Sequence, residues 1–217
     1  MKSIILIAAP AAGKGTEAAK IKEEYNIPHI STGDLLRAEI AKGNEEINEL
    51  IKNGQLVGDD IVLNLLKNRI MENDCDNGYI LDGFPRNVDQ AIAYDKILEE
   101  LNKDIGIVIV LDIDKEIAKS RISGRMSCPN CGNVYNLNSN DMKPKNGILC
   151  DTCNTELTRR ADDNPDTYDE RYNTYLSKTA PLIDYYKDRG IVYTVSASGS
   201  VDETHEQVKK LLEEQYD

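Results

Sequence analysis

Residues 4–16, Ile-Ile-Leu-Ile-Ala-Ala-Pro-Ala-Ala-Gly-Lys-Gly-Thr, constrain the fold more than any other part of the chain. The β-branched apolar run predicts a buried strand, and helix-forming residues follow to about Tyr25. Small residues and Gly13-Lys14 connect the strand to the helix. A strand, a tight loop and a helix in this order bring backbone N–H groups and a lysine together, which favours an anion-binding site.

The same stretch departs from the phosphate-binding pattern G-x-x-x-x-G-K-[ST] at two positions. Ala8 stands where the pattern has its first glycine, and Gly15 stands where it has a hydroxyl residue, which comes one position later as Thr16. Strand–turn–helix units also occur in parallel α/β proteins with other functions. The stretch alone therefore suggests phosphate binding and leaves a purely structural turn as the alternative.

Composition limits the class of protein. The 217 residues are enough for one sizeable core with a small inserted domain, and the net charge is −12 with 29% charged residues. The negative electrostatic field of such a protein repels nucleic acid and anionic membranes. No apolar run approaches the roughly 20 residues of a membrane span, and no signal-peptide profile is present. We therefore expect a cytoplasmic protein that binds anions only at a local basic cluster.

The next polar motif is Ser31-Thr32-Gly33-Asp34, which follows a short predicted strand and opens a helix. Arg37 comes one turn later, so its guanidinium could reach an anion at the start of that helix. A plain helix N-terminus is the alternative interpretation of the motif. His29 lies in the preceding strand, and we expect it to be packed, with no partner evident.

Tyr79-Ile80-Leu81-Asp82-Gly83-Phe84-Pro85-Arg86 places a carboxylate, a glycine and an arginine at the end of an apolar strand. In a phosphate-binding α/β protein, an aspartate at such a strand end can hold magnesium directly or through water. An ordinary strand-end turn is the alternative. Gln90 follows one helical turn after the arginine.

Four of the five cysteines form two C-x-x-C pairs, Cys128–Cys131 and Cys150–Cys153, separated by eighteen residues. This spacing predicts a four-thiolate tetrahedral zinc site with no open position, and hence a structural metal. Arginines flank the segment on both sides: Arg121 and Arg125, placed on one helix face, and Arg159-Arg160. The segment therefore has the features of a lid that carries positive charge. Cys75 has no such neighbours and is expected to be a buried structural thiol.

The alternation of apolar runs and helical patterns predicts five strands, at about residues 4–8, 27–30, 79–82, 105–111 and 191–195. The last is followed by a charged helix, in which we expect His205 to lie on the surface. Strands separated by helices form a parallel sheet covered on both faces. We therefore predict an α/β fold with a five-stranded parallel sheet, helices on both faces and a small inserted zinc-binding segment.

Taken together, these motifs resemble the adenylate kinases, in particular the long bacterial form with a zinc-bearing lid. Residues 10–16, 31–37, 81–86, Gly124-Arg125, the two cysteine pairs and residues 159–163 carry the resemblance, which covers nearly the whole chain. It implies a nucleoside monophosphate kinase with a P-loop core at 1–30, 61–121 and 160–217. It also implies a monophosphate-binding lobe at 31–60 and a lid at 122–159.

The resemblance implies the reversible reaction ATP + AMP = 2 ADP, with magnesium bound to ATP and structural zinc in the lid. The protein would be a monomer that binds no nucleic acid and no membrane. The residues that it assigns to catalysis are Lys14, Arg86, Arg125, Arg160 and Arg171. To ATP it assigns Pro10, Ala11, Ala12, Gly13, Lys14, Gly15, Thr16, Arg121 and Arg125. To AMP it assigns Thr32, Arg37, Val57, Gly83, Arg86, Gln90, Arg160 and Arg171. Asp82 would orient magnesium-bound water, and Cys128, Cys131, Cys150 and Cys153 would bind zinc.

The chain departs from the family pattern within the first loop and helix. The family has glycine at the positions of Ala8 and Ala11, where glycine permits a positive φ or a close approach to phosphate, and usually glutamine at the position of Glu17. Alanine with a positive φ costs about 1 kcal/mol. We therefore expect an active enzyme with weakened or altered binding of the triphosphate.

Three alternatives stay open at this stage. One is a related kinase for another monophosphate or another donor, although Thr32 and Gln90 favour AMP. Another is a nucleotide-binding regulator that has lost turnover through Ala8 and Ala11. A third would use the cysteine pairs to bind nucleic acid, against which the acidic net charge and the absence of a basic stripe argue.

Overall fold

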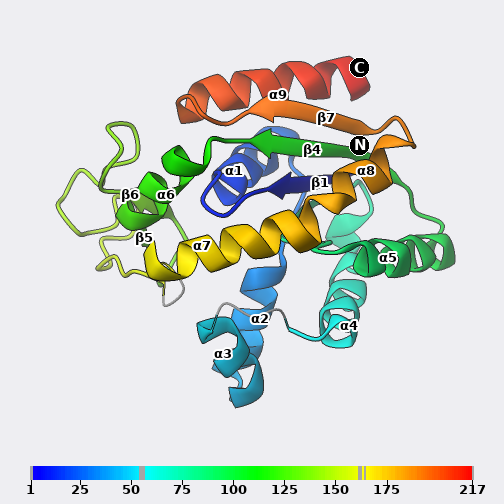
Figure 1. Ribbon diagram of the computed structural model, residues 1–217, viewed down its shortest axis with the longest axis horizontal. Helices are drawn as coiled ribbons and strands as arrows, with labels where there is room; N and C mark the ends of the chain where they lie inside the picture. Colours follow the sequence, from blue (N-terminus) through cyan, green and yellow to red (C-terminus); the bar gives the residue numbers. More distant parts are fainter. Residues whose placement is uncertain (1, 54–56, 161–162, 164, 217) are drawn as a thin grey trace.

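The computed structural model describes residues 2–53, 57–160, 163 and 165–216, with the side chains of 165 and 166 excepted (Figure 1). The strands are β1 (Ser3–Ala8), β2 (His29–Ser31), β3 (Ile80–Asp82), β4 (Ile105–Asp112), β5 (Arg125–Ser127), β6 (Val134–Asn136) and β7 (Val192–Ser196). The α-helices are α1 (Lys14–Tyr25), α2 (Thr32–Ala41), α3 (Glu45–Lys52), α4 (Asp59–Ile70), α5 (Val88–Leu101), α6 (Lys115–Gly124), α7 (Pro165–Thr174), α8 (Pro181–Lys187) and α9 (Val201–Tyr216).

Five strands form one parallel sheet in the order β2-β3-β1-β4-β7, as the sequence predicts. Strand β1 lies at its centre and pairs with β3 on one side and β4 on the other. The register places Leu6 beside Asp82, and Asp82 beside Ser31. The loop after β1 and the polar ends of β2 and β3 therefore meet at the carboxyl edge of the sheet, where open α/β sheets bind their ligands.

The central strand explains why helices cover both faces. All six residues of β1 are buried, and successive side chains alternate between two cores. Ile4 and Leu6 pack in one core with buried residues of α1, α6, α7 and α9. Ile5 and Ile7 pack in the other with residues of α2, α3, α4, α5 and α8. An unbroken apolar strand is the pattern that a sheet buried on both faces requires.

The cysteine-bearing segment forms a small unit of its own beside the sheet, at the left of Figure 1. Strands β5 and β6 pair antiparallel, with Arg125 opposite Asn136. Its buried apolar cluster is small and consists of Met126, Cys128, Tyr135, Cys150 and Leu157. Helix α6 ends at Gly124, so Arg125 begins a strand and does not share a helix face with Arg121, which corrects the sequence-based placement.

Helix α7 continues through a π-helical turn at Tyr175–Thr179 into α8, whose first residue is Pro181. Proline cannot donate the backbone bond that a continuous helix needs, and an interruption before Pro181 is the expected result. Helix α9 packs on β7 and α1 at the far side of the sheet from α2 and α3 (Figure 1). Among the described residues, no helix is both long enough and apolar enough to cross a membrane.

Candidate active site

A cavity of about 1060 Å³ opens at the carboxyl edge of the sheet. Its volume is at the upper end of the roughly 300–1,000 Å³ typical of ligand pockets. The sequence-predicted residues that line it are Pro10, Ala11, Ala12, Gly13, Lys14, Gly15, Thr16, Arg37, Asp82, Gly83, Arg86, Arg121, Arg125, Arg160 and Arg171. Thr32, Val57 and Gln90 are buried and lie outside this lining. The structure thus gathers the predicted basic residues around one space.

The loop between β1 and α1 has a left-handed backbone at two positions, and the family pattern offered a positive φ as one reason for glycine at one of them, Ala11. Gly13 has φ 99°, and Ala11 has φ 63°. Gly13 adopts this geometry freely, whereas the Cβ atom of Ala11 makes it strained. Ala8 ends β1 opposite Leu111 and has no positive φ, so that explanation for a family glycine does not apply to it. Close approach of a ligand is the remaining reason to expect glycine there.

Lys14 is the first residue of α1, and its ammonium points back under the loop. Its Nζ donates to the carbonyl of Ala8 at 3.1 Å. Burial lowers the pKa of Lys14 to about 8; the positive charges of Arg86, Arg171 and Arg125 act in the same direction, and Asp82 acts against them. A desolvated cation surrounded by other cations is a site that an anion would stabilise.

Asp82 is the last residue of β3 and lies close to the junction of the phosphate-binding loop with α1. A Cβ atom added to Gly15 would lie 3.6 Å from its Oδ2. Burial alone would raise the pKa of Asp82, but contact with His29 and the charge of Lys14 hold it below its ordinary value. His29 Nε2 lies 3.4 Å from Oδ2, so His29 is packed as predicted but has a partner that the sequence did not reveal. An ionised carboxylate at this point suits a hydrated divalent cation.

Arg86 is held in place by the turn that follows β3. Its Nε donates to the carbonyl of Gly83 at 2.8 Å, and the Thr32 hydroxyl donates to the same carbonyl at 2.9 Å. Gly83 has φ 79°, and a Cβ there would meet Thr32 Oγ1 at 3.0 Å. The side chain of Gln90 accepts from the Arg86 amide at 2.7 Å and donates to Asp59 at 2.6 Å. Thr32 and Gln90 therefore fix the turn that carries Arg86, although neither residue lines the cavity.

Asp163 joins two of the predicted arginines. It is 5% exposed, accepts from Arg125 Nε at 2.6 Å and lies 3.4 Å from Arg171 Nη1. The carboxylate fixes both guanidinium groups toward the cavity. Asp163 belongs to the 159–163 motif that carries the family resemblance, but the sequence predicts no function for it. Asp162 of the same motif and residues 54–56 of the expected lobe lie outside the described residues.

Arg121 and Arg160 are held by other contacts. Arg121 donates to the carbonyls of Ala197 and Gly199 at 2.9 and 2.8 Å, which ties α6 to the loop after β7. Burial lowers its pKa. Arg160 Nε donates to Ser127 Oγ at 3.2 Å, which links it to the β5 strand. The planes of both guanidinium groups are therefore oriented by the protein, as binding of a nucleotide would require.

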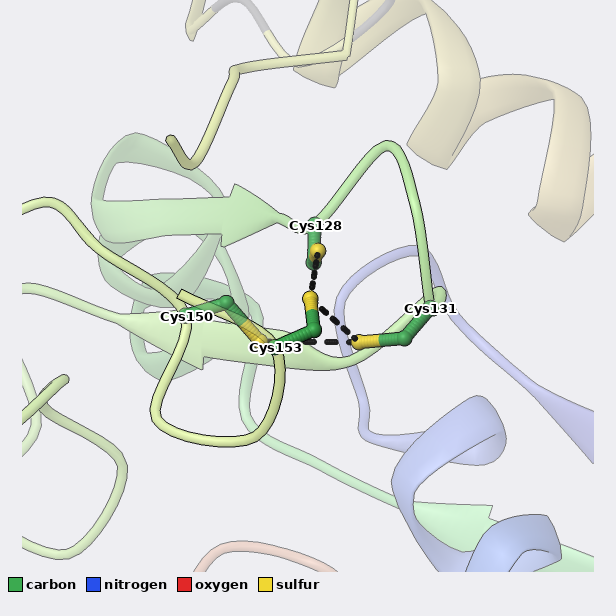
Figure 2. A group of neighbouring side chains, drawn as sticks. All are labelled: Cys128, Cys131, Cys150 and Cys153. Carbon is green, nitrogen blue, oxygen red and sulfur yellow. Dashed lines mark hydrogen bonds between the residues drawn. The ribbon is translucent and has the colours of Figure 1, made fainter. Parts of the chain in front are cut away.

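The four paired cysteines converge as predicted (Figure 2). Their sulfur atoms all lie within 4.8 Å of one another, with distances of 3.4 Å for Cys128–Cys153, 3.5 Å for Cys131–Cys150 and 3.6 Å for Cys153–Cys131. A tetrahedral zinc site with Zn–S bonds of about 2.3 Å has sulfurs roughly 3.8 Å apart. The thiolate set therefore fits a metal ion.

The chemistry around these sulfurs also suits a metal. Hydrogen bonds, foremost from Thr155, lower the pKa of Cys153 to about 5. The Tyr135 hydroxyl lies 3.3 Å from Cys150 Sγ and accepts from the amide of Asp151 at 2.9 Å. Such surrounding contacts orient the sulfur ligands and favour the thiolate at Cys150 and Cys153, whereas burial and the neighbouring cysteines raise the pKa of Cys131. The fifth cysteine, Cys75, is buried, in agreement with the prediction.

His205 contradicts the sequence-based placement on the surface. Its side chain is 14% exposed and contacts Glu17 of α1 at 2.8 Å and Glu24 at 3.1 Å. Glu17 is 2% exposed and lines the cavity. Residues 188 positions apart carry no local pattern that could reveal this contact. The sequence offered one signal, a carboxylate at Glu17 where the family pattern usually has glutamine.

A parallel sheet with a glycine–lysine loop, a strand-end aspartate and converging arginines defines a P-loop nucleotide kinase. Residues 6–191 match the family model described as adenylate kinase. The chain is 46% identical to an adenylate kinase of Kosmotoga olearia, covering 97% of this chain and 99% of that one. It is 43% identical to the adenylate kinases of Thermodesulfovibrio yellowstonii and Archaeoglobus fulgidus, covering 97% of this chain and 98% of each relative. The chain therefore belongs to the adenylate kinase family and is a phosphotransferase.

Proposed function

We propose that this protein catalyses the reversible, magnesium-dependent transfer of a phosphoryl group from ATP to AMP, giving two ADP. The observation that carries the proposal is the convergence of Lys14, Arg86, Arg125 and Arg171 on one cavity beside Asp82. Phosphoryl transfer needs two nucleotides in line, neutralised negative charge and exclusion of water. A ring of fixed cations beside a loop rich in backbone N–H groups meets the first two needs.

The donor triphosphate would lie on the loop at residues 10–16, with its phosphates on the backbone N–H groups and Lys14. Arg121 would stack on the donor base, since its guanidinium is held flat by two carbonyls. Arg125 would reach the transferring group from β5. Asp82 is the carboxylate that would hold the water ligands of magnesium, which would supply positive charge to the donor phosphates.

AMP would lie near α2 and the turn after β3, within the proposed lobe at 31–60. Arg37 and Arg86 would bind its phosphate, while Thr32, Val57, Gly83 and Gln90 would form the rest of the subsite. Both ends of the Gln90 amide are engaged in the structure, so contact with adenine requires exchange of its bond to Asp59. Arg160 and Arg171 would reach the phosphoryl group from the opposite side.

The segment at 122–159 would act as a lid held together by structural zinc on Cys128, Cys131, Cys150 and Cys153. Its small apolar cluster supports this, because so few buried residues cannot stabilise a fold of that length alone. Closure would bring Arg125 and Arg160 to the phosphates and exclude water from the donor. Lid motion is then the step that limits turnover.

The donor and acceptor are tested with a nucleotide panel under magnesium. ATP, GTP, CTP and UTP are each paired with AMP, and ATP is paired with each of the four monophosphates. We expect the ATP–AMP pair to give the highest kcat/KM. A higher value for UMP, CMP or GTP would assign the protein to a different monophosphate kinase, and binding of nucleotides without product would make it a regulator.

A further inference from the structure

Glu17 is a buried carboxylate that borders the cavity beside the phosphate-binding loop. It is 2% exposed, lies in the first turn of α1 and lines the cavity together with Lys14. Its amide donates to the carbonyl of Gly13 at 2.9 Å and so closes the first turn of α1, where the phosphate-binding loop ends. The position of Glu17 and the shape of the loop are therefore coupled.

The partner of this carboxylate comes from the C-terminal helix. His205 Nδ1 lies 2.8 Å from Glu17 Oε1, and Nε2 lies 3.1 Å from Glu24 Oε2. Burial raises the pKa of Glu17, and its hydrogen bond with His205 acts in the opposite direction. Each ring nitrogen of His205 therefore faces one of the two carboxylates. His205 thus engages Glu17 by a hydrogen bond and does not itself line the cavity.

Other charged groups on the same two helices do not take this role. Lys20 bonds Asp202 at 2.7 Å, and Lys209 bonds Glu24. Both pairs are more exposed than the Glu17–His205 contact and therefore contribute little. They connect α1 with α9 on the outside, whereas the His205 contact reaches the residue that borders the cavity.

We propose that His205 is a positioning residue for the donor nucleotide: it holds the Glu17 carboxylate in place by a hydrogen bond, so that the phosphate-binding loop accepts a polyanion. The inference rests on the proposed function only in taking a nucleoside triphosphate as the ligand of this loop. Without His205, the unpaired Glu17 carboxylate repels the phosphates and draws in water or counter-ions, and the first turn of α1 is less well fixed. The acceptor nucleotide, bound near α2, is unaffected.

The test is a double-mutant cycle at the two positions, with ATP and AMP binding to the full-length protein measured by calorimetry. We expect His205→Ala to weaken ATP binding about tenfold, or ~1.4 kcal/mol, and to leave AMP binding unchanged. Glu17→Gln, which removes the charge but keeps the shape, should bind ATP at least as tightly as the parent. In the Glu17→Gln background, His205→Ala should have no further effect on ATP.

Two further variants separate positioning from helix docking. Lys209→Ala removes an α1–α9 contact that does not involve Glu17, and we expect ATP affinity to be unchanged. His205→Asn places an amide nitrogen near the position of Nδ1, keeps the bond to Glu17 and should recover most of the lost ATP affinity. It also serves in the cycle if His205→Ala does not fold, which a thermal melt of each variant determines.

Three results would overturn the inference: unchanged ATP affinity in His205→Ala, an equal loss of ATP and AMP affinity, or the same loss of ATP affinity in the Glu17→Gln background. Because the readout is binding, the inference and the proposed function fail separately. A parent protein that binds ATP but forms no ADP refutes the proposed kinase activity and leaves the cycle measurable. A parent that forms ADP while its variants bind ATP normally refutes only the role of His205.

Discussion

Ala11→Gly tests whether the loop at 10–16 is strained in this protein. Ala11 has φ 63°, a left-handed geometry that costs an L-residue about 1–2 kcal/mol. Glycine removes this cost, but its greater conformational freedom in the unfolded chain lowers the free energy of unfolding by about 0.4–1 kcal/mol. The methyl group is only partly buried against the core. The expected change in the free energy of unfolding is therefore a gain of up to about 1 kcal/mol.

Ala12→Gly is the matched control. Ala12 is 3% exposed and is not among the described residues with a positive φ, so the substitution relieves no strain. It removes a buried methyl group, which contributes about 0.8 kcal/mol, and glycine again increases the entropy of the unfolded chain. The free energy of unfolding should therefore fall by about 1–2 kcal/mol in total. For a chain of this length, 1 kcal/mol shifts the melting temperature by roughly 2–4 °C. The two variants should therefore differ by about 1–3 kcal/mol, and Ala11→Gly should melt about 2–12 °C above Ala12→Gly in calorimetry.

The same variant addresses the ligand. The methyl of Ala11 lines the cavity where phosphate would approach the backbone. We expect Ala11→Gly to lower the KM for ATP by up to about fivefold, or ~1 kcal/mol, with the KM for AMP unchanged. If Ala11→Gly melts as low as Ala12→Gly, the strain argument is wrong. If the KM for ATP and the turnover both stay the same, the expected weakening of triphosphate binding is wrong.

Three further predictions concern charge and metal. Because the pKa of Lys14 is lowered to about 8, its ammonium is fully present below about pH 7 and is lost as the pH rises; kcat/KM for ATP should fall above pH 8, and a profile flat to pH 9.5 would contradict this. Asp163→Asn leaves Arg125 and Arg171 without their shared buried anion and should lower kcat about 10²-fold; unchanged kcat in a folded variant would refute the role of Asp163. Metal analysis should find one zinc per chain, and Cys153→Ser should abolish it and lower the melting temperature; a metal-free parent of equal stability would contradict the zinc site.

Much of the fold is readable from the sequence because its signals are local. The unbroken apolar strand at residues 4–8, followed by small residues and Gly13-Lys14, predicts the central strand and the tight loop that leads into α1. The cysteine spacing predicts a cluster that the structure brings within 4.8 Å, because each C-x-x-C pair already fixes two ligands on one turn. The positive φ at Ala11 is likewise a local property that a glycine pattern can reveal.

What the sequence does not reveal depends on tertiary packing. Glu17 and His205 meet only because α9 packs on α1, and Asp163 joins Arg125 and Arg171 only because the chain returns from β5 and β6 to the sheet. At Ala8 the structure has an ordinary strand end without a positive φ, so of the two reasons for a family glycine there, only close approach of a ligand remains. Sequence motifs identify the residues that do the chemistry, whereas tertiary packing determines which other side chains hold those residues in place.

The central claim is that this chain converts ATP and AMP into ADP in one cavity. Chromatography of products from ATP plus AMP with magnesium tests it, alongside reactions that lack either nucleotide or the metal. We predict two ADP for each ATP consumed, no ADP without AMP or without magnesium, and a loss of turnover in Lys14→Met with the melting temperature maintained. ADP formation from ATP alone would indicate hydrolysis, and bound nucleotides without ADP would indicate a regulator; either result would contradict the claim.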